Sequence, residues 1–213
     1  MLINEFFYFN EGLNAVDCKS IIEMADDKFE DASVNTKKFI SNNERKTGSI
    51  AVYEKETAVR KSGIFFSSDQ WLFDLIWPFM QEANKDAGWE YDISGCESIQ
   101  ITKYDSSDYY HWHKDGNGCQ MSKYQEPDNT WLNGNVRKLS MTILLSDDYT
   151  GGDFQIASLN SDRGSYSVTV HTPPVEGIGS IVVFPSFLMH RINPVEKGIR
   201  YSLVAWFVGP PFK

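Results

Sequence analysis

The four histidines are the residues of this sequence best suited to metal chemistry: His111, His113, His171 and His190. His113 is followed two positions later by Asp115. In an extended strand, residues i and i+2 point to the same face, so this imidazole and this carboxylate can bind one ion. His111 cannot complete the site, because residues four apart on a strand are separated by roughly 13 Å. The third ligand must come from another strand, and we expect it to be His190.

Two imidazoles and one carboxylate on one side of a metal leave its other positions open. This arrangement is the facial triad of non-haem iron(II) oxygenases, whose open positions take a co-substrate and dioxygen. Zinc uses the same donor types, so the ligand set alone does not select the metal. A closed zinc site needs a fourth protein ligand, which Cys119 could supply only if its loop folded back. Two simpler interpretations stay open: His113 and Asp115 as a surface pair at a strand end, and His190 as a core histidine.

Ten residues after His190 comes Arg200, followed by Ser202. On a strand these two side chains face the same way, together with Val204 and Trp206, and we expect Trp206 to fill the barrel interior beneath Arg200. A buried arginine is costly unless it is paired with an anion. Its guanidinium can bind a carboxylate with two hydrogen bonds, and a nearby hydroxyl can donate another. Arg200 is therefore a candidate carboxylate anchor, the alternative being an ion pair with a protein Asp or Glu.

Several other residues are weaker candidates. His111 is expected at the partly exposed rim of the site, and His171 is expected to be structural or exposed. Arg137 either meets a substrate carboxyl group or lies at a solvated strand end. Trp131 and Tyr124 either line a peptide groove or only pack the loop that carries them.

The first ninety residues carry helical patterns. Asn14 or Asp17 can cap a helix that runs through Phe29. A second helix is expected to begin at a Ser68 or Asp69 cap and to end at Gly88, with a kink or break at Pro78. Its apolar residues recur at helical spacing: Trp71, Leu72, Leu75, Ile76, Phe79, Met80 and Ala83.

From residue 97 onward the apolar pattern has the period of two that is typical of strands. One predicted strand face carries Leu139, Met141, Ile143 and Leu145, and another carries Tyr166, Val168 and Val170. Many short strands separated by Gly, Pro and Asn turns indicate a sandwich or barrel. We therefore predict a mainly β protein with N-terminal helices and a jelly-roll (double-stranded β-helix) core. The stretch 116–136 has no clear period and is a candidate active-site lid.

Composition indicates one packed globular domain over residues 1–213, with a helix-rich support region at 1–95 and a catalytic jelly-roll core at 96–213. The net charge is −9 and the basic residues are scattered, which argues against nucleic acid or an anionic membrane as a partner. The three cysteines, Cys18, Cys96 and Cys119, are far apart, and the N-terminus does not read as a signal peptide. We expect a soluble cytoplasmic protein.

Three segments, in order, resemble the prolyl-4-hydroxylase-like branch of the iron(II)- and 2-oxoglutarate-dependent dioxygenases. They are the aromatic strand leading into His-x-Asp (104–115), a strand ending at a Gly-Gly turn (137–154), and the segment with the distal His and basic anchor (179–207). The resemblance runs from about Ile99 to Phe207. It implies that His113, Asp115 and His190 bind iron(II), that Arg200 pairs with the distal carboxylate of 2-oxoglutarate, and that Tyr104 and Ser202 assist. Collagen-type members carry Lys where this chain has Arg200.

The resemblance further implies hydroxylation with dioxygen, decarboxylation of 2-oxoglutarate to succinate and, optionally, ascorbate. Related halogenases have a small residue at the position of Asp115, so the carboxylate favours hydroxylation. A prolyl residue in a peptide or protein is the expected substrate. The alternatives are a free amino acid or small metabolite with the same cofactors, or a non-catalytic metal-binding jelly-roll module.

Overall fold

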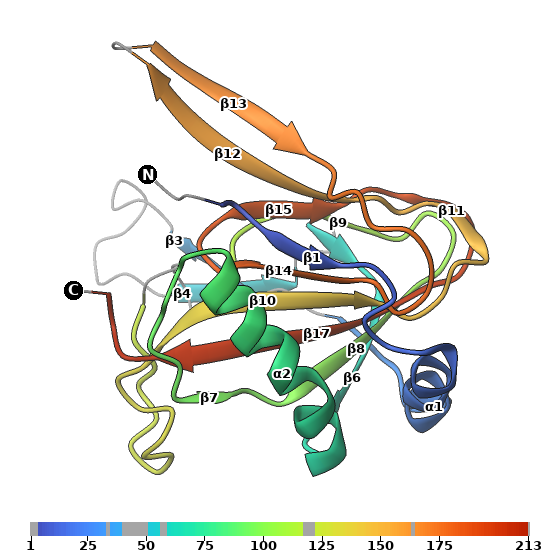
Figure 1. The fold of residues 1–213 in the computed structure, drawn as a ribbon, viewed down its shortest axis with the longest axis horizontal. Helices are drawn as coiled ribbons and strands as arrows, with labels where there is room; N and C mark the ends of the chain where they lie inside the picture. The colour runs from blue at the N-terminus through green and yellow to red at the C-terminus, as the bar shows by residue number, and fades with distance from the viewer. Residues whose placement is uncertain are drawn as a thin grey trace.

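The computed structural model describes residues 4–32, 35–39, 51–55, 59–116, 122–162 and 165–212. Residues 117–121, which include Cys119, lie outside these ranges. The interpretations of Cys119 as a fourth metal ligand and of the stretch 116–136 as an active-site lid therefore stay predictions. The described chain is mostly antiparallel strands arranged in two larger sheets, with two helices on one side (Figure 1). This confirms the predicted mainly β jelly-roll with N-terminal helices.

The larger sheet has eight strands, all paired antiparallel. Its order is β1 (Phe7–Phe9), β14 (Ile181–Pro185), β10 (Val136–Leu144), β17 (Arg200–Gly209), β8 (Ile99–Tyr104), β6 (Gly63–Ser67) and β2 (Glu30–Asp31), with β7 (Gly95–Cys96) also paired to β17.

The second sheet has five strands, and it holds the His-x-Asp segment next to the distal histidine. Its order is β13 (Ser165–His171), β12 (Phe154–Asp162), β15 (Met189–Ile192), β9 (Tyr109–His113) and β5 (Arg60–Lys61). Two smaller ladders pair β11 (Tyr149–Gly151) with β16 (Val195–Gly198), and β3 (Asn35–Phe39) with β4 (Ala51–Lys55).

Successive strand residues of the eight-stranded sheet alternate between an apolar face and a mixed face that carries polar residues together with apolar ones such as Val182 and Phe184. The apolar face packs against both helices and forms the main core. Its strand members are Ile99, Ile101, Leu139, Met141, Ile143, Ile181, Val183, Leu203, Ala205 and Phe207, all at most 2% exposed. The opposite face carries buried polar residues such as Gln100, Thr102 and Ser202, and it turns toward the five-stranded sheet. The predicted face of 139–145 is therefore a core face, as expected.

The first helix, α1 (Ala15–Ala25), begins at the predicted cap: the side chain of Asn14 accepts a hydrogen bond from the backbone N–H of Asp17 at 2.9 Å. The prediction that it continues through Phe29 is wrong. The helix ends at Ala25, because Asp26 is already non-helical with ψ of 141°, and Asp27 follows in a left-handed conformation with φ of 58°. Phe29 nevertheless packs against the main core, because the chain turns back toward the sheet.

The second helix, α2 (Gln70–Asp86), follows Asp69, and Gly88 takes a left-handed conformation with φ of 72° just beyond its end. A kink or a break was expected at Pro78; the helix does not break there, because it is continuous across this residue. Pro78 and Asp74 both lie on the exposed side of the helix, so solvent can satisfy the Asp74 carbonyl that proline leaves without a donor. Among the described helices, none is both long and apolar enough to cross a membrane.

Two features of the strands go beyond the sequence pattern. The segment before residue 96 contains both helices but also contributes β1, β2, β5 and β6 to the two main sheets. The hairpin of β12 and β13 projects from the body of the molecule (Figure 1). Strand β13 forms where it is predicted, but Val168 and Val170 on its apolar face are 65% and 48% exposed.

Candidate metal centre

The three predicted metal ligands come together in one cluster. One ligand atom from each of His113, Asp115 and His190 lies within 4.8 Å of the others. Nε2 of His190 is 3.4 Å from Oδ2 of Asp115, and Nε2 of His113 is 3.9 Å from Oδ1. These are the spacings of donors that can bond one ion from one side, so the cluster is a candidate metal site.

The strand pairing explains why these residues meet. His113 near the end of β9 lies directly opposite His190 on β15, and cross-strand partners point to the same side of a sheet. Asp115 follows β9 by two residues, and its backbone N–H donates to the carbonyl of Ser186 at 3.0 Å. The spacing correctly predicted that His113 and Asp115 lie side by side, but only His113 is on the strand. The register of β15 against β9 supplies the third ligand.

Both imidazoles are oriented by the backbone. Nδ1 of His113 is 2.8 Å from the carbonyl oxygen of His111, and Nδ1 of His190 is 2.9 Å from that of Leu188. A carbonyl can only accept, so each Nδ1 carries the proton and each Nε2 presents a lone pair to the cluster. The Ser140 hydroxyl donates to Oδ2 of Asp115 at 2.7 Å, which orients the carboxylate. Hydrogen bonds of this kind to the far side of ligands are characteristic of metal sites.

Burial and charge favour the ligand forms of these side chains. Burial, followed by the charge of His190, lowers the pKa of His113 to about 3, so its imidazole is neutral. For Asp115, burial alone would raise the pKa, but the neighbouring His190, His113 and Arg137 and the hydrogen bond from Ser140 together outweigh burial, and the pKa is lowered. At neutral pH the site therefore offers a neutral His113 imidazole and an Asp115 carboxylate, which are the forms in which these groups bind metals.

Arg200 is 3% exposed, and its Nε and Nη1 atoms are buried without a hydrogen-bond partner in the described part of the chain. No ion pair joins it to a carboxylate among these residues, contrary to the alternative interpretation of a structural ion pair. Arg200 lines a cavity that shares Thr142 and Phe154 with the metal cavity. A buried cation with free N–H groups beside the metal cluster fits an anionic ligand.

Both predicted helpers line the metal cavity, and Tyr104 also contacts Arg200. Tyr104 is directly opposite Arg200 in the pairing of β8 with β17, and its ring centre is 5.6 Å from the guanidinium carbon. Tyr104 and Ser202 are both buried and line the metal cavity, which has a volume of about 210 Å³. Trp206 lines the same cavity, further along β17.

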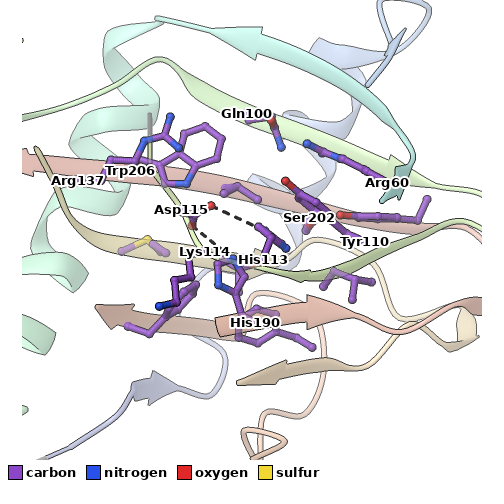
Figure 2. Close-up of a pocket in the computed structure, with 18 residues that line it drawn as sticks. Arg60, Gln100, Tyr110, His113, Lys114, Asp115, Arg137, His190, Ser202 and Trp206 are labelled. Carbon is purple, nitrogen blue, oxygen red and sulfur yellow. Dashed lines mark ion pairs between the residues drawn. The ribbon is translucent and has the colours of Figure 1, made fainter. Parts of the chain in front are cut away.

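Figure 2 shows further residues that sequence reasoning missed. Arg60, from the two-residue strand β5, faces the metal cavity with its guanidinium 4.6 Å from the ring centre of Tyr110, and its Nη2 is buried without a partner. The Tyr110 ring stacks on His113 at 3.4 Å between centres. Nothing in the sequence near Arg60 signals this placement, because it depends on the pairing of β5 with β9.

Arg137 does not lie at a solvated strand end: it is largely buried and lines the metal cavity, and its contact with a substrate carboxyl group stays a prediction. Its guanidinium binds Glu97 with two hydrogen bonds of 2.7 Å and stacks over the ring of Trp206 at 4.1 Å. The Tyr124 hydroxyl also donates to Glu97, at 2.6 Å, so this residue fastens its loop to the wall of the metal cavity.

Two histidines stay outside the cluster. His111 is exposed, as predicted for a rim residue, and contributes only its backbone carbonyl to His113. His171 lies elsewhere, with Nε2 2.8 Å from a carboxylate oxygen of Glu5 and 2.9 Å from the Ser158 hydroxyl.

The cluster fits iron(II) and 2-oxoglutarate on two observations. Three ligand atoms, two nitrogen and one oxygen, converge from one side, and among the described residues no fourth His, Cys, Asp or Glu joins them. A facial set of this kind leaves room for a bidentate co-substrate. The unpaired N–H atoms of buried Arg200 supply donors for a carboxylate in the adjoining cavity.

Comparisons with known proteins agree with this chemistry. The model of the 2OG-Fe(II) oxygenase superfamily matches residues 99–208. A PKHD-type hydroxylase of Idiomarina loihiensis is 29% identical over 110 residues, which is 51% of this chain but 40% of that relative. A PKHD-type hydroxylase of Escherichia coli is 28% identical over 108 residues, again 40% of its length. The chain thus aligns with less than half of these curated relatives.

Solved structures show the same fold at low sequence identity. The viral collagen prolyl hydroxylase of Paramecium Bursaria Chlorella virus-1 has a TM-score of 0.59 at 15% identity, covering 97% of both chains. A Pseudomonas putida prolyl-4-hydroxylase has a TM-score of 0.57 at 16% identity, covering 97% of this chain and 98% of its own. The family match spans more than half of the sequence, including the three candidate ligands and Arg200. The chain therefore belongs to the 2OG-Fe(II) oxygenase superfamily.

Proposed function

We propose that this protein is an iron(II)- and 2-oxoglutarate-dependent hydroxylase that acts on a prolyl residue of a polypeptide. The observation that carries the proposal is the convergence of His113, Asp115 and His190 within 4.8 Å, next to the unpaired guanidinium of Arg200. Bound iron(II), 2-oxoglutarate and dioxygen would together supply the oxidising power for a C–H hydroxylation, with decarboxylation of 2-oxoglutarate to succinate.

The chain's own residues hold and orient these groups. His113 and His190 present Nε2 lone pairs because their Nδ1 protons are donated to backbone carbonyls. Asp115 is fixed by Ser140, and Arg200, with Tyr104 and Ser202 nearby, binds the distal carboxylate of 2-oxoglutarate. The rings of Tyr110, Phe154 and Phe184 line the cavity beside the histidines and limit the access of water.

A prolyl substrate is supported by two kinds of likeness. Three solved neighbours are prolyl hydroxylases, and one of these three is in complex with a peptide fragment. The curated relatives are PKHD-type hydroxylases. A free amino acid with the same cofactors is the competing substrate class, and the same assay separates the two.

The test is succinate formation from 2-oxoglutarate by the purified chain with iron(II) and ascorbate in air. Proline-containing peptides and free proline are supplied in parallel, and mass spectrometry determines whether the products have gained the mass of one oxygen atom. Asp115→Ala should abolish succinate formation, whereas Asp86→Ala, an exposed carboxylate at the end of α2, should leave it unchanged. Succinate formation that survives Asp115→Ala, or its absence with every substrate, would contradict the proposal. Oxidation of free proline alone would shift the substrate class.

A further inference from the structure

The hairpin of β12 and β13 leaves the body of the molecule as a two-stranded ribbon (Figure 1). Strand β12 is paired with β15 only from Phe154 to Ala157, whereas it is paired with β13 from Ile156 to Asp162. From Ser158 onward, β12 therefore has β13 as its only neighbour among the described strands. A two-stranded hairpin is at best marginally stable in water, and further strands stabilise it.

The two faces of this hairpin have the reverse of the usual polarity. On one face Ser158 is buried, and its hydroxyl is 2.9 Å from Nε2 of His171. On the other face Leu159 lies opposite Val168, and these side chains are 69% and 65% exposed. Val170, two residues further along this face, is 48% exposed. A strand usually buries its apolar face and exposes its polar face, so the exposed apolar face indicates a surface that a partner covers.

Strand β13 is the edge of the five-stranded sheet, and it lies on the side of the hairpin that faces away from the body (Figure 1). Its sequence, SYSVTVH, contains no Asp, Glu, Lys, Arg, Pro or Gly. Natural proteins usually protect an exposed edge strand from pairing with other chains by charges, by proline or by a bulge. The register of β13 with β12 is regular from Ser165 to His171, so no bulge protects this edge. An edge of this kind is suited to pair with a further strand.

The sequence of this edge is symmetric about Val168, with Ser167 before it and Thr169 after it. A second β13 that runs antiparallel can therefore place Val168 opposite Val168 and each Ser167 opposite Thr169. An interface between two identical chains related by a two-fold axis requires self-complementarity of this kind. Because the strand carries no acidic or basic residue, two chains of net charge −9 can meet here without like charges opposite each other.

We propose that β13 is the interface between two copies of this chain, which pair antiparallel about Val168. The pairing joins the two five-stranded sheets edge to edge and turns two marginal ribbons into a four-stranded one. Cross-strand partners point to the same side of a sheet, so Leu159, Val168 and Val170 of both copies form one continuous apolar strip. A strand of another polypeptide could use the same edge, but the symmetry about Val168 favours a second copy. None of the metal ligands takes part, so this interface is independent of the proposed function.

The test is sedimentation velocity of the full chain over a wide range of concentration, in which the wild type should pass from monomer to dimer. Val168→Lys should raise the dissociation constant of the dimer by about tenfold or more, because two like charges then face each other at the axis. The matched control is Val16→Lys, since Val16 is 73% exposed on α1, outside the hairpin, and this variant should dimerise like the wild type. Leu159→Lys separates the edge from the face. Leu159 lies on β12, one strand away from the edge, so this variant should still dimerise.

Chemical cross-linking gives a second measurement that does not depend on disrupting the interface. Val168→Cys brings two thiols together at the axis, so a short bismaleimide should join two chains of this variant. Val16→Cys should give no more cross-linked dimer than the wild type with its native cysteines. Thermal melts confirm that each variant is folded.

A wild-type chain that stays monomeric at every concentration overturns the proposal and leaves a strand of another polypeptide as the occupant of the edge. A dimer that survives Val168→Lys, or that Val16→Lys weakens as much, also overturns it, as does a Val168→Cys chain that forms no cross-linked dimer. If Leu159→Lys weakens the dimer as much as Val168→Lys does, the hairpins pack face to face and the pairing of their edges is refuted.

Discussion

Replacing Arg200 with Met tests whether this buried cation exists to bind a ligand. Met has a similar length and no charge, so it can occupy the space beside Gly152 that the arginine stem fills. The lost guanidinium leaves no protein carboxylate unpaired among the described residues, because none pairs with it. We therefore expect the ligand-free Arg200→Met protein to be as stable as the wild type, or more stable, because a buried charge without a partner is removed.

The same change should cost most of the affinity for 2-oxoglutarate. Nε and Nη1 of Arg200 are both free to donate, and a hydrogen bond to a charged group contributes about 1.5–3 kcal/mol. Two such bonds amount to roughly 3–6 kcal/mol, or about a 10²- to 10⁴-fold weaker binding. Isothermal titration of the Mn(II)-loaded protein with 2-oxoglutarate measures this loss. Thermal melts with and without 2-oxoglutarate give an independent reading, since a ligand at 100 times its Kd stabilises by about 2.7 kcal/mol.

Two results would refute this reasoning. If Arg200→Met unfolds easily without ligand, the guanidinium has a structural role, as a partner of a protein carboxylate would. If the variant is stable but binds 2-oxoglutarate as tightly as the wild type, the carboxylate is anchored elsewhere. Arg200→Lys separates charge from geometry: it keeps the charge but cannot form the paired hydrogen bonds, so an intermediate affinity is expected.

Four further outcomes are expected. Ser140→Ala should lower metal affinity about 10- to 100-fold, because Asp115 loses a 2.7 Å hydrogen bond. Titration with Mn(II) measures this affinity. Unchanged affinity would mean that Ser140 is not needed to orient the Asp115 carboxylate. Glu97→Gln should destabilise the fold by about 3 kcal/mol in urea unfolding, because a largely buried arginine loses its ion pair; a loss below 1 kcal/mol would contradict this. Gly179→Ala should lower the free energy of unfolding by more than about 3 kcal/mol, since the added Cβ would lie 1.8 Å from a backbone oxygen. Gly134→Ala, at a similar φ but in open space, should lower it by about 1 kcal/mol. Equal losses in the two variants would show that the structure relieves the contact at Gly179. Removal of metal with EDTA should abolish succinate formation but leave a cooperative thermal unfolding transition, because none of the three ligands belongs to the main apolar core. Loss of the cooperative unfolding transition after EDTA treatment would contradict this.

The parts of the site that follow from local periodicity could be predicted from sequence. The i, i+2 spacing of strands correctly indicated that His113 and Asp115 lie side by side, even though Asp115 falls two residues beyond the end of β9. That His190 is the third ligand could only be inferred from chemistry and family resemblance, since its place opposite His113 is a matter of strand register. Arg60 could not be found at all, because a two-residue strand has no period and exists only through its pairing with β9.

The two ends of α1 were likewise predicted with different success. The start of α1 followed from its Asn14 cap, but the apolar stripe suggested that it continues to Phe29. The sequence contained a contrary signal in Asp26 and Asp27, because acidic side chains are unfavourable at a helix C-terminus. Phe29 still joins the core, so an apolar residue in helical phase shows that a position is buried without showing that the helix reaches it.

The buried arginines distinguish structural charge from charge kept for a ligand. Arg137 forms two hydrogen bonds with Glu97. Burial alone would lower the pKa of Arg137, but the hydrogen bond and the charge of Glu97 outweigh burial and raise it, so the charge is satisfied by the protein itself. Arg60 and Arg200 are buried but keep N–H atoms without partners among the described residues. Arg60 lines the metal cavity, and Arg200 lines the cavity that shares Thr142 and Phe154 with it. A fold selected for stability alone would replace such residues with apolar ones, because an unpaired buried cation is destabilising. Their presence around one cluster of metal ligands is therefore best explained by ligands that bring the missing acceptors.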